Sequence, residues 1–199
     1  MPAEQGLNDA ARQTARVFFA LWPDAALREQ LHRASGLLHQ AHGGRRMKPE
    51  TVHLTLLFVG SLERERLPEL QAAADGIRVP SFDVVFDRAG CWRHNRIAFL
   101  SASQPPAALF DLVNALETRV GLADIRFDRR PYKPHITLLR QADCKKNSPV
   151  LTPIVWAARD FVLVESKLDS EGAGYRELAR WRLSEIDDAF EMTGQFLDR

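Results

Sequence analysis

The sequence contains little cysteine, no long apolar run and almost no excess of charge. Its 199 residues include two cysteines, Cys91 and Cys144, in unrelated contexts, so no disulfide framework or zinc-binding spacing can be built from them. We expect both to be free thiols in a reducing compartment. No apolar stretch is long enough to span a bilayer, and the polar N-terminus lacks the apolar core of a signal peptide. These absences predict a cytoplasmic protein that does not associate with membranes.

The charges nearly cancel but are unevenly distributed. With 27 basic and 26 acidic residues, the formal net charge of +1 does not indicate a nucleic-acid-binding protein. Basic residues nevertheless gather in three segments: Arg45, Arg46, Lys48, Arg126, Arg129, Arg130, Lys133, Arg140, Lys145 and Lys146. Any one of them could be a solvated loop residue. Together they would create a local positive potential that favours an anionic substrate.

Two short segments of the chain are almost identical. Residues 53–58 read HLTLLF, residues 135–140 read HITLLR, and each follows a Lys-Pro lead-in. Short blocks of Val, Ile, Leu and Thr predict buried strands, in which alternate side chains share a face. Each strand therefore presents an imidazole and a hydroxyl on one side. Cleavage of a phosphodiester without a metal needs a general base, a general acid and donors for the phosphoryl oxygens.

The rest of the pattern predicts an α+β fold built on antiparallel sheets. Alternating or apolar runs predict strands at residues 16–22, 52–59, 82–86, 96–101, 135–139, 161–164 and 175–183. Helical stripes predict a helix capped by Asp24 and closed by Gly43, a second over residues 67–77, and a third from Pro105 to Gly121. We expect a hairpin turn at residues 94–95 and an optional short helix after Ser184. One motif in each half suggests two similar lobes, with outer helices and a cleft between them.

The paired His-x-Thr motifs and their flanks resemble the two-histidine phosphoesterase superfamily, in its bacterial RNA 2′,3′-cyclic phosphodiesterase (2′-5′ RNA ligase-like) branch. The supporting segments are residues 16–21, 53–60, 87–92, 133–140 and 175–181. The resemblance implies a pseudo-symmetric two-lobed domain at residues 16–183. It leaves outside a flexible extension at residues 1–15 and a C-terminal extension at residues 184–199.

The resemblance also implies roles for individual residues. His53 matches the proton donor and His135 the proton acceptor, while Thr55, Thr137 and Arg140 match groups that bind the phosphate. No metal and no cofactor is implied. Three aromatic residues could stack on a terminal base, although packing in the core is the more common fate of each: Phe18, Phe19 and Phe58.

Other interpretations of the same residues stay open. The histidines could be satisfied core residues or zinc ligands, but neither motif contains a third ligand, and an arginine beside the pair disfavours a cation. The threonines could simply be good strand formers, and Arg140 could be a solvated strand end.

The predicted function is metal-independent hydrolysis of RNA 2′,3′-cyclic phosphate ends to 2′-phosphomonoesters, with 2′-5′ ligation as a possible reverse reaction. Its expected partners are RNA ends, including tRNA fragments, or small cyclic nucleotides, bound by a monomer. The alternatives are a relative that cleaves 2′-5′ linkages or a cyclic nucleotide metabolite, and a non-catalytic module that binds RNA ends.

Overall fold

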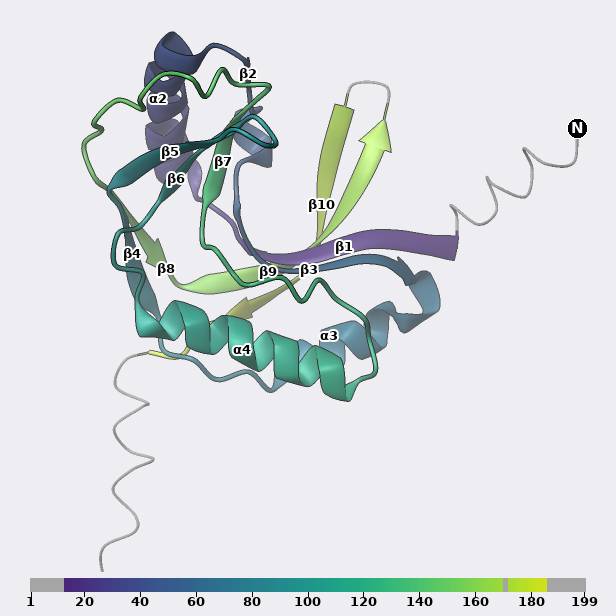
Figure 1. Ribbon diagram of the computed structural model, residues 1–199. Coiled ribbons are helices and arrows are strands. Elements are labelled where there is room, and N and C mark those ends of the chain that lie inside the picture. Colours follow the sequence, from purple (N-terminus) through teal and green to yellow (C-terminus); the bar gives the residue numbers. More distant parts are fainter. Residues whose placement is uncertain (1–12, 170–171, 186–199) are drawn as a thin grey trace, which may run out of the picture.

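The structure is a computed structural model that describes residues 13–169 and 172–185. Its main feature is an antiparallel sheet with the strand order β10-β9-β1-β3-β7-β6-β5, with β2 paired to β7 (Figure 1). One half of the sheet contains β1 (Thr14–Leu21), β3 (Leu54–Glu63), β9 (Asp160–Asp169) and β10 (Gly172–Arg182). The other half contains β2 (Arg45–Arg46), β5 (Arg88–Trp92), β6 (Ile97–Ser101) and β7 (Ile136–Arg140).

The two halves meet at one register pair, Leu54 of β3 opposite Ile136 of β7. Beyond this pair β3 and β7 diverge, and each continues into its own half of the sheet. A separate two-stranded sheet pairs β4 (Phe82–Phe86) with β8 (Ile154–Ala158). Helices and antiparallel strands are thus combined as predicted, which confirms the α+β class.

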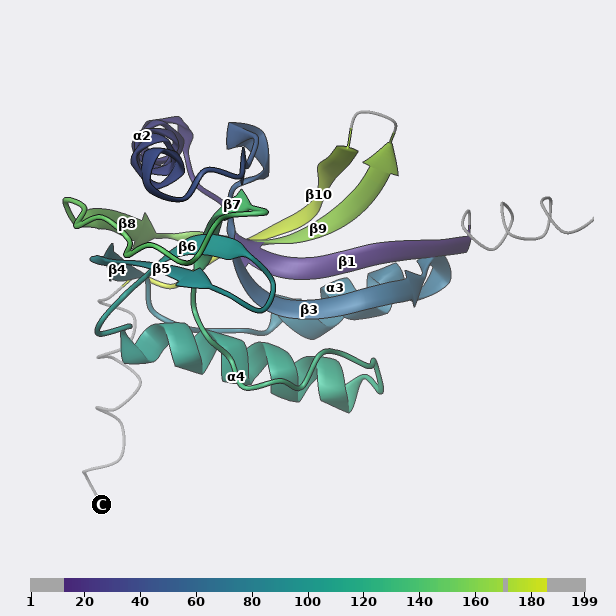
Figure 2. The same cartoon turned by 45° about the horizontal axis from the view of Figure 1, so that its top comes forward.

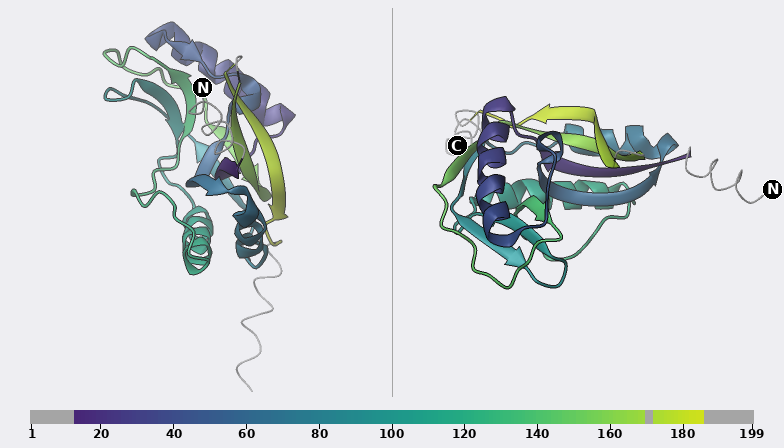
Figure 3. Two further views of the ribbon diagram at one scale, coloured as in Figure 1. Left: turned by 90° about the vertical axis from the view of Figure 1, so that its right-hand side faces the viewer. Right: turned by 90° about the horizontal axis from the view of Figure 1, so that it is seen from above.

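Three α-helices in the described ranges cover this framework: α2 (Ala25–His42), α3 (Leu67–Asp75) and α4 (Ala107–Leu122). Two short 3₁₀ turns precede β3 and α3: η1 (Pro49–Thr51) and η2 (Arg64–Arg66). Helix α2 packs on β7 and β2, whereas α3 and α4 pack on each other and on β10 and β3. The helices therefore lie on opposite sides of the strands (Figures 2 and 3). Of the helices described, none has both the length and the apolar character needed to cross a bilayer.

Helix α2 shows how the local signals determine an element. The Asp24 side chain accepts a hydrogen bond from the Leu27 amide, and the amide of Gly43 bonds to the carbonyl of His39 at the other end. The predicted apolar stripe is buried against the sheet: Leu27, Leu31, Ala34 and Leu38. Gly44 follows the Gly43 that ends the helix, and its φ is 82°. A Cβ at Gly44 would lie 2.7 Å from the carbonyl oxygen of Arg140. Only glycine fits at this turn, which brings β2 alongside the end of β7.

Several strand predictions need correction. Strands β2, β5 and β8 lie where no strand is predicted. Strand β4 pairs with β8 rather than forming a hairpin with β6, whose hairpin partner is β5. The sequence does not indicate β8, because Val155 on its solvent side is apolar although 54% exposed. This hides the alternation of apolar and polar residues that predicts a half-buried strand. Strand β3 does not end at Gly60 but continues to Glu63, because the glycine adopts φ of 87° within the strand.

The structure describes the predicted start of the first strand, but not the helix expected after Ser184. Strand β1 begins at Thr14, slightly before the expected start at Arg16. The optional helix after Ser184 lies outside the described residues. Ser184 itself forms an isolated bridge with Pro80, so the chain is still attached to the fold at this point.

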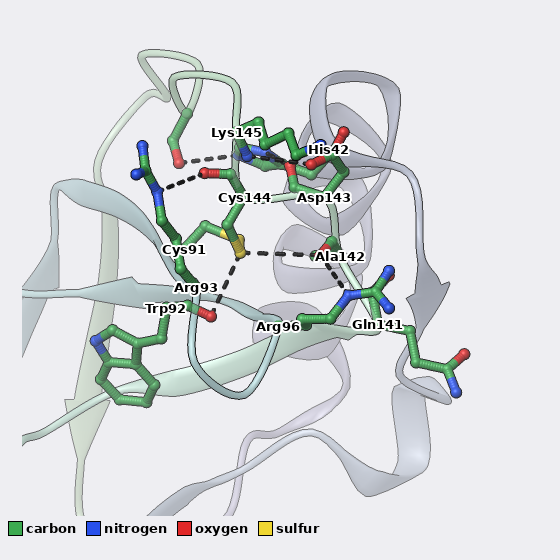
Figure 4. The surroundings of a disulfide bond; sticks show 11 residues. His42, Cys91, Trp92, Arg93, Arg96, Gln141, Ala142, Asp143, Cys144 and Lys145 are labelled. Carbon is green, nitrogen blue, oxygen red and sulfur yellow. Dashed lines mark hydrogen bonds between the residues drawn. A yellow bond between two sulfur atoms is a disulfide. The ribbon is translucent and has the colours of Figure 1, made fainter.

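The prediction of two free thiols is wrong, because Cys91 and Cys144 form a disulfide (Figure 4). Cys91 lies on β5 and Cys144 lies in the loop after β7, with their Cα atoms 5.3 Å apart. Strand β6 pairs with both β5 and β7, which brings the two segments together across 53 residues of sequence. Arg93 adds a hydrogen bond from Nε to the carbonyl of Cys144. No local pattern in the sequence indicates that these two cysteines are close in space.

We expect reduction of this bond to lower the free energy of unfolding by about 2–4 kcal/mol, the usual contribution of a disulfide. The reason is that the closed loop restricts the unfolded chain. The measurement is the chemical unfolding midpoint with and without dithiothreitol. The Cys91→Ser/Cys144→Ser variant serves as the control, and its midpoint should not respond to the reductant. Equal midpoints for the oxidised and reduced wild-type protein would contradict a stabilising role.

Candidate active site

Both His-x-Thr motifs lie where the two halves of the sheet meet. Leu54 and Ile136, the residues between each histidine and threonine, have no exposed surface. The neighbouring side chains point to the opposite face, and the antiparallel register places each histidine on the side of the other motif's threonine. A cavity of about 360 Å³ lies over this face and is lined by all five residues expected to act in catalysis: His53, Thr55, His135, Thr137 and Arg140.

The two imidazoles are oriented in the same way. Nδ1 of His53 lies 2.8 Å from the carbonyl oxygen of Thr51, and Nδ1 of His135 lies 2.7 Å from that of Lys133. A carbonyl can only accept a hydrogen bond, so Nδ1 carries the proton in both rings. Each Nε2 is therefore the atom that can take or give a proton in the reaction. The carbonyl that fixes each ring lies two residues before it in the sequence.

His53 lies in an aromatic environment built from two strands and the residue after β1. Its ring stacks on Trp22 with 5.3 Å between centroids and on Phe18 with 4.8 Å, and Tyr175 meets it edge-on at 5.3 Å. Burial lowers the pKa of His53 to about 4, against the opposing effect of its bond to the Thr51 carbonyl; the charges of His135 and Arg140 lower it further. The free protein therefore holds this imidazole mainly in the neutral form at pH 7.

His135 is less enclosed. The ring of Trp92 approaches it edge-on with 4.6 Å between centroids, and Phe99 lies farther away at 6.0 Å. Burial lowers the pKa of His135 below its ordinary value, and the bond to the Lys133 carbonyl partly offsets this. The two histidines thus occupy unlike environments, as an acid and base pair with separate tasks requires.

The other polar groups of the cavity are available to a ligand. Within the described residues, the hydroxyls of Thr55 and Thr137 and the guanidinium of Arg140 have no hydrogen-bond or ion-pair partner on the protein. Arg140 ends β7, where its backbone pairs with Arg45 of β2. Two hydroxyl donors and one guanidinium beside two imidazoles can hold a phosphate diester and transfer protons around it.

The three aromatic residues expected to stack on a base have different positions. Phe19 has no exposed surface and packs against Phe161 and Trp181 in the main core, which is the fate that the sequence favoured over stacking on a base. Alternation along β1 turns Phe18 to the cavity, but it is 3% exposed and its ring supports His53. Phe58 is half-buried and lines the cavity, with the guanidinium of Arg16 4.8 Å from its ring centroid.

Sequence reasoning missed Trp22, Tyr175 and Trp92 as neighbours of the histidines. Trp22 and Tyr175 are 153 residues apart by their numbers, and the pairing of β9 with β1 and β10 brings them to the same side of the sheet. The only available signal was their place at the end of β1 and in the late strand that supported the family resemblance. It did not indicate contact with His53.

The donor set does not suit a metal. In the ranges 13–169 and 172–185, no three His, Cys, Asp or Glu side chains are arranged to hold an ion. Threonines, aromatic rings and Arg140 surround the two imidazoles instead, and a guanidinium at this place repels a cation. The residues present fit an anion better than a metal.

This fold and this site define a two-histidine phosphoesterase. The model of the LigT-like phosphoesterase family matches residues 21–99 and 100–175, one motif in each segment, and the chain belongs to this family. The RNA 2′,3′-cyclic phosphodiesterase of Escherichia coli K12 is 33% identical over 171 residues, which cover 85% of this chain and 97% of the relative. The enzyme of the same name from Thermus thermophilus is 29% identical over 184 residues, covering 84% of this chain and 90% of the relative.

Solved structures agree with the sequence relatives. The crystal structure of E. coli LigT in its apo form has a TM-score of 0.75 and 33% identity, and the match covers 87% of this chain and 99% of LigT. The LigT complex with 3′-AMP matches with the same TM-score and 32% identity, over 87% of this chain and 100% of LigT. The predicted family and fold are confirmed.

Proposed function

We propose that this protein hydrolyses 2′,3′-cyclic phosphate ends of RNA to 2′-phosphomonoesters. The observation that carries the proposal is one cavity lined by two histidines whose Nδ1 atoms are both held by carbonyls, by two threonines and by one arginine. The names of the curated relatives support the choice of substrate. A binding module would have no need of two titratable groups in unlike environments.

In the proposed reaction, Nε2 of His135 takes a proton from water as the water oxygen attacks phosphorus. The bond from phosphorus to O3′ breaks, and His53 gives its Nε2 proton to the departing oxygen. The charge that develops on the phosphoryl oxygens is stabilised by Thr55, Thr137 and Arg140. We expect Phe58, which lines the cavity, to stack on the terminal base. The strained five-membered ring of the substrate lowers the demand on this apparatus.

We further propose that the protein acts in the cytoplasm as a monomer, on RNA ends that include tRNA fragments or on small cyclic nucleotides. A cytoplasmic setting tends to keep thiols reduced. There, the bond between Cys91 and Cys144 would form only under oxidising conditions.

The direct test is to incubate the purified protein with a short RNA that ends in a 2′,3′-cyclic phosphate and to identify the product isomer. The expected product is a 2′-phosphate, since O3′ leaves from the His53 side. A 3′-phosphate would contradict the assigned leaving group. Cleavage of an internal 2′-5′ linkage, or of a cyclic nucleotide metabolite alone, would identify the protein as a different phosphodiesterase of the same superfamily.

The pH dependence should reveal the desolvated histidines. Catalysis needs one neutral and one protonated imidazole. A plot of kcat/KM against pH should therefore be bell-shaped, and the pKa values of the two histidines in the free protein set the positions of its two limbs. Both pKa values lie below the ordinary value of 6.5, that of His53 at about 4, so kcat/KM should peak below pH 6.5 and fall as pH rises through 7. A bound phosphate anion raises both pKa values, so the bell for kcat should lie at higher pH.

A variant that tests this profile is Trp22→Ala. Loss of the stacked Trp22 ring exposes the His53 ring to water and should raise the pKa of His53. One limb of the bell should then move to higher pH. A wild-type kcat/KM that peaks above pH 7 with chemistry rate-limiting would contradict the proposed environment of the histidines.

A further inference from the structure

The catalytic cavity contains more positive charge than a cyclic phosphate needs. It is lined by two arginines, Arg140 and Arg16, and none of the described residues in its lining is an aspartate or a glutamate. A 2′,3′-cyclic phosphate is a diester with a single negative charge, and Arg140 and the two threonines are already assigned to it. The cation of Arg16 therefore suits a second anionic group on the substrate.

Arg16 belongs to the half of the sheet that supports His53. It lies on β1, opposite Ser61 of β3 on one side and Ser166 of β9 on the other. Its side chain lines the cavity together with that of Phe18, two residues farther along the strand and therefore on the same face. Arg140 ends β7 in the other half, so the two guanidinium groups come from different halves of the sheet (Figure 1).

The guanidinium of Arg16 is oriented by an aromatic ring and has no anionic partner. Its Cζ lies 4.8 Å from the centroid of the Phe58 ring, a cation–π contact that does not use the N–H donors. In the part of the chain that the structure describes, the Arg16 side chain forms no hydrogen bond or ion pair. The carboxylate of Glu165 on the adjoining strand β9 is paired with other arginines. The donors of Arg16 are thus available to a ligand.

The charges of Arg16 and Arg140 act on the same part of the cavity. Burial raises the pKa of the Tyr175 hydroxyl, and the charges of Arg140 and Arg16 both oppose this effect. The Tyr175 ring also meets that of His53 edge-on, with 5.3 Å between the centroids. One side chain beside His53 therefore lies within the influence of both cations.

The proposed reaction determines which part of the substrate lies near Arg16. His53 protonates O3′, so the ribose that carries O3′ lies on the His53 side of the phosphorus atom. A base and a 5′ oxygen are attached to the same ribose. Phe58 is expected to stack on the base, and Arg16, beside Phe58, is the charged group available to a phosphate on the 5′ oxygen. The cavity of about 360 Å³ is large enough for one nucleotide.

We propose that Arg16 binds the phosphate on the 5′ oxygen of the terminal nucleotide and thereby favours RNA ends over free cyclic nucleotides. In RNA this phosphate is the linkage to the preceding nucleotide, whereas a nucleoside 2′,3′-cyclic phosphate has a 5′-hydroxyl there. The inference rests on the proposed function. It names the residue that distinguishes the two kinds of substrate given there.

The test compares three compounds that differ only at the 5′ oxygen. They are adenosine 2′,3′-cyclic phosphate with a 5′-hydroxyl, with a 5′-phosphate and with a 5′-methyl phosphate, which is a diester like the linkage in RNA. The wild-type protein should hydrolyse both phosphorylated compounds with a kcat/KM about tenfold higher, the effect of one charge-assisted hydrogen bond at an exposed side chain. Most of the difference should lie in KM, because the 5′ phosphate takes no part in the bond changes.

A matched set of variants assigns this preference to one side chain. Arg16→Gln should reduce the ratio of kcat/KM between phosphorylated and unphosphorylated compounds to about one, and Arg16→Lys should retain part of the preference because it keeps the charge. The control is Arg129, an exposed arginine outside the catalytic cavity whose Cζ lies 5.3 Å from the centroid of the Phe127 ring. Arg129→Gln should keep the wild-type ratio. Because each ratio is measured on one protein, a loss of folded material cancels.

The outcomes separate this inference from the proposed function. A wild-type ratio near one would overturn the role of Arg16, as would equal ratios in Arg16→Gln and Arg129→Gln. An unchanged ratio in Arg16→Gln, even with all three rates lowered, would overturn it as well, because Arg16 would then not act on the 5′ phosphate. Each of these results leaves the hydrolase intact. Absence of hydrolysis of a cyclic-phosphate RNA by the wild-type protein would overturn the proposed function and this inference with it.

Discussion

Replacement of His53 or His135 by alanine is expected to lower kcat by about 10²–10⁴, the contribution of one positioned proton-transfer group. Each imidazole is fixed by a carbonyl at Nδ1 and presents Nε2 to the same cavity, so neither can take over the task of the other. The double variant should lose less than the product of the two single effects, because the groups act as a unit.

The matched control for these variants is His39→Ala, since His39 lies in the last turn of α2 and does not line the catalytic cavity. Its kcat should equal that of the wild type. Multiplicative losses in the double variant would show that the two histidines act in separate steps, and wild-type rates in either single variant would remove that residue from the mechanism.

Removal of a side chain that binds the phosphate should lower activity nearly as much as removal of a histidine, but should leave the shape of the pH profile unchanged. Thr55→Val, Thr137→Val and Arg140→Ala each remove a group placed to stabilise the transition-state charge, typically worth about 2.7–4 kcal/mol when fully engaged. We expect kcat/KM to fall by about 10²–10³. The bell shape of the pH profile should survive, because these residues carry no proton in the reaction.

Conservative variants separate hydroxyl chemistry from packing. Thr55→Ser and Thr137→Ser keep the hydroxyl and should recover much of the rate that valine loses, although valine preserves the shape of the side chain better. Arg140→Lys keeps the charge without the two-pronged guanidinium and should recover only part. Full activity in either valine variant would show that the hydroxyl does not bind the phosphate.

The catalytic residues could be predicted because their signal is local. Each motif contains its histidine and threonine on one strand face, so alternation alone placed each pair, and the repetition indicated that the pairs work together. Helix α2 was equally accessible, since Asp24 and Gly43 mark its ends within its own sequence. Which strands adjoin each other depends on contacts distant in sequence, and alternation does not report them.

The surroundings of the histidines show this limit. Trp22 directly follows β1, Phe18 lies on β1 and Tyr175 lies on β10. Only the pairing of these strands through β9 brings the three side chains around His53. The disulfide also depends on pairing, because β6 brings the segments of Cys91 and Cys144 together. Phe18 and Phe19 could not be told apart until the sheet showed which face of β1 meets the core.

The measurement that tests the central claim most directly is turnover of a 2′,3′-cyclic-phosphate RNA after exhaustive treatment of the protein with EDTA. The account assigns both proton transfers to imidazoles and the stabilisation of charge to Thr55, Thr137 and Arg140, so kcat and KM should be unchanged by the chelator. Loss of turnover in EDTA with recovery on addition of Mn²⁺ or Zn²⁺ would contradict it.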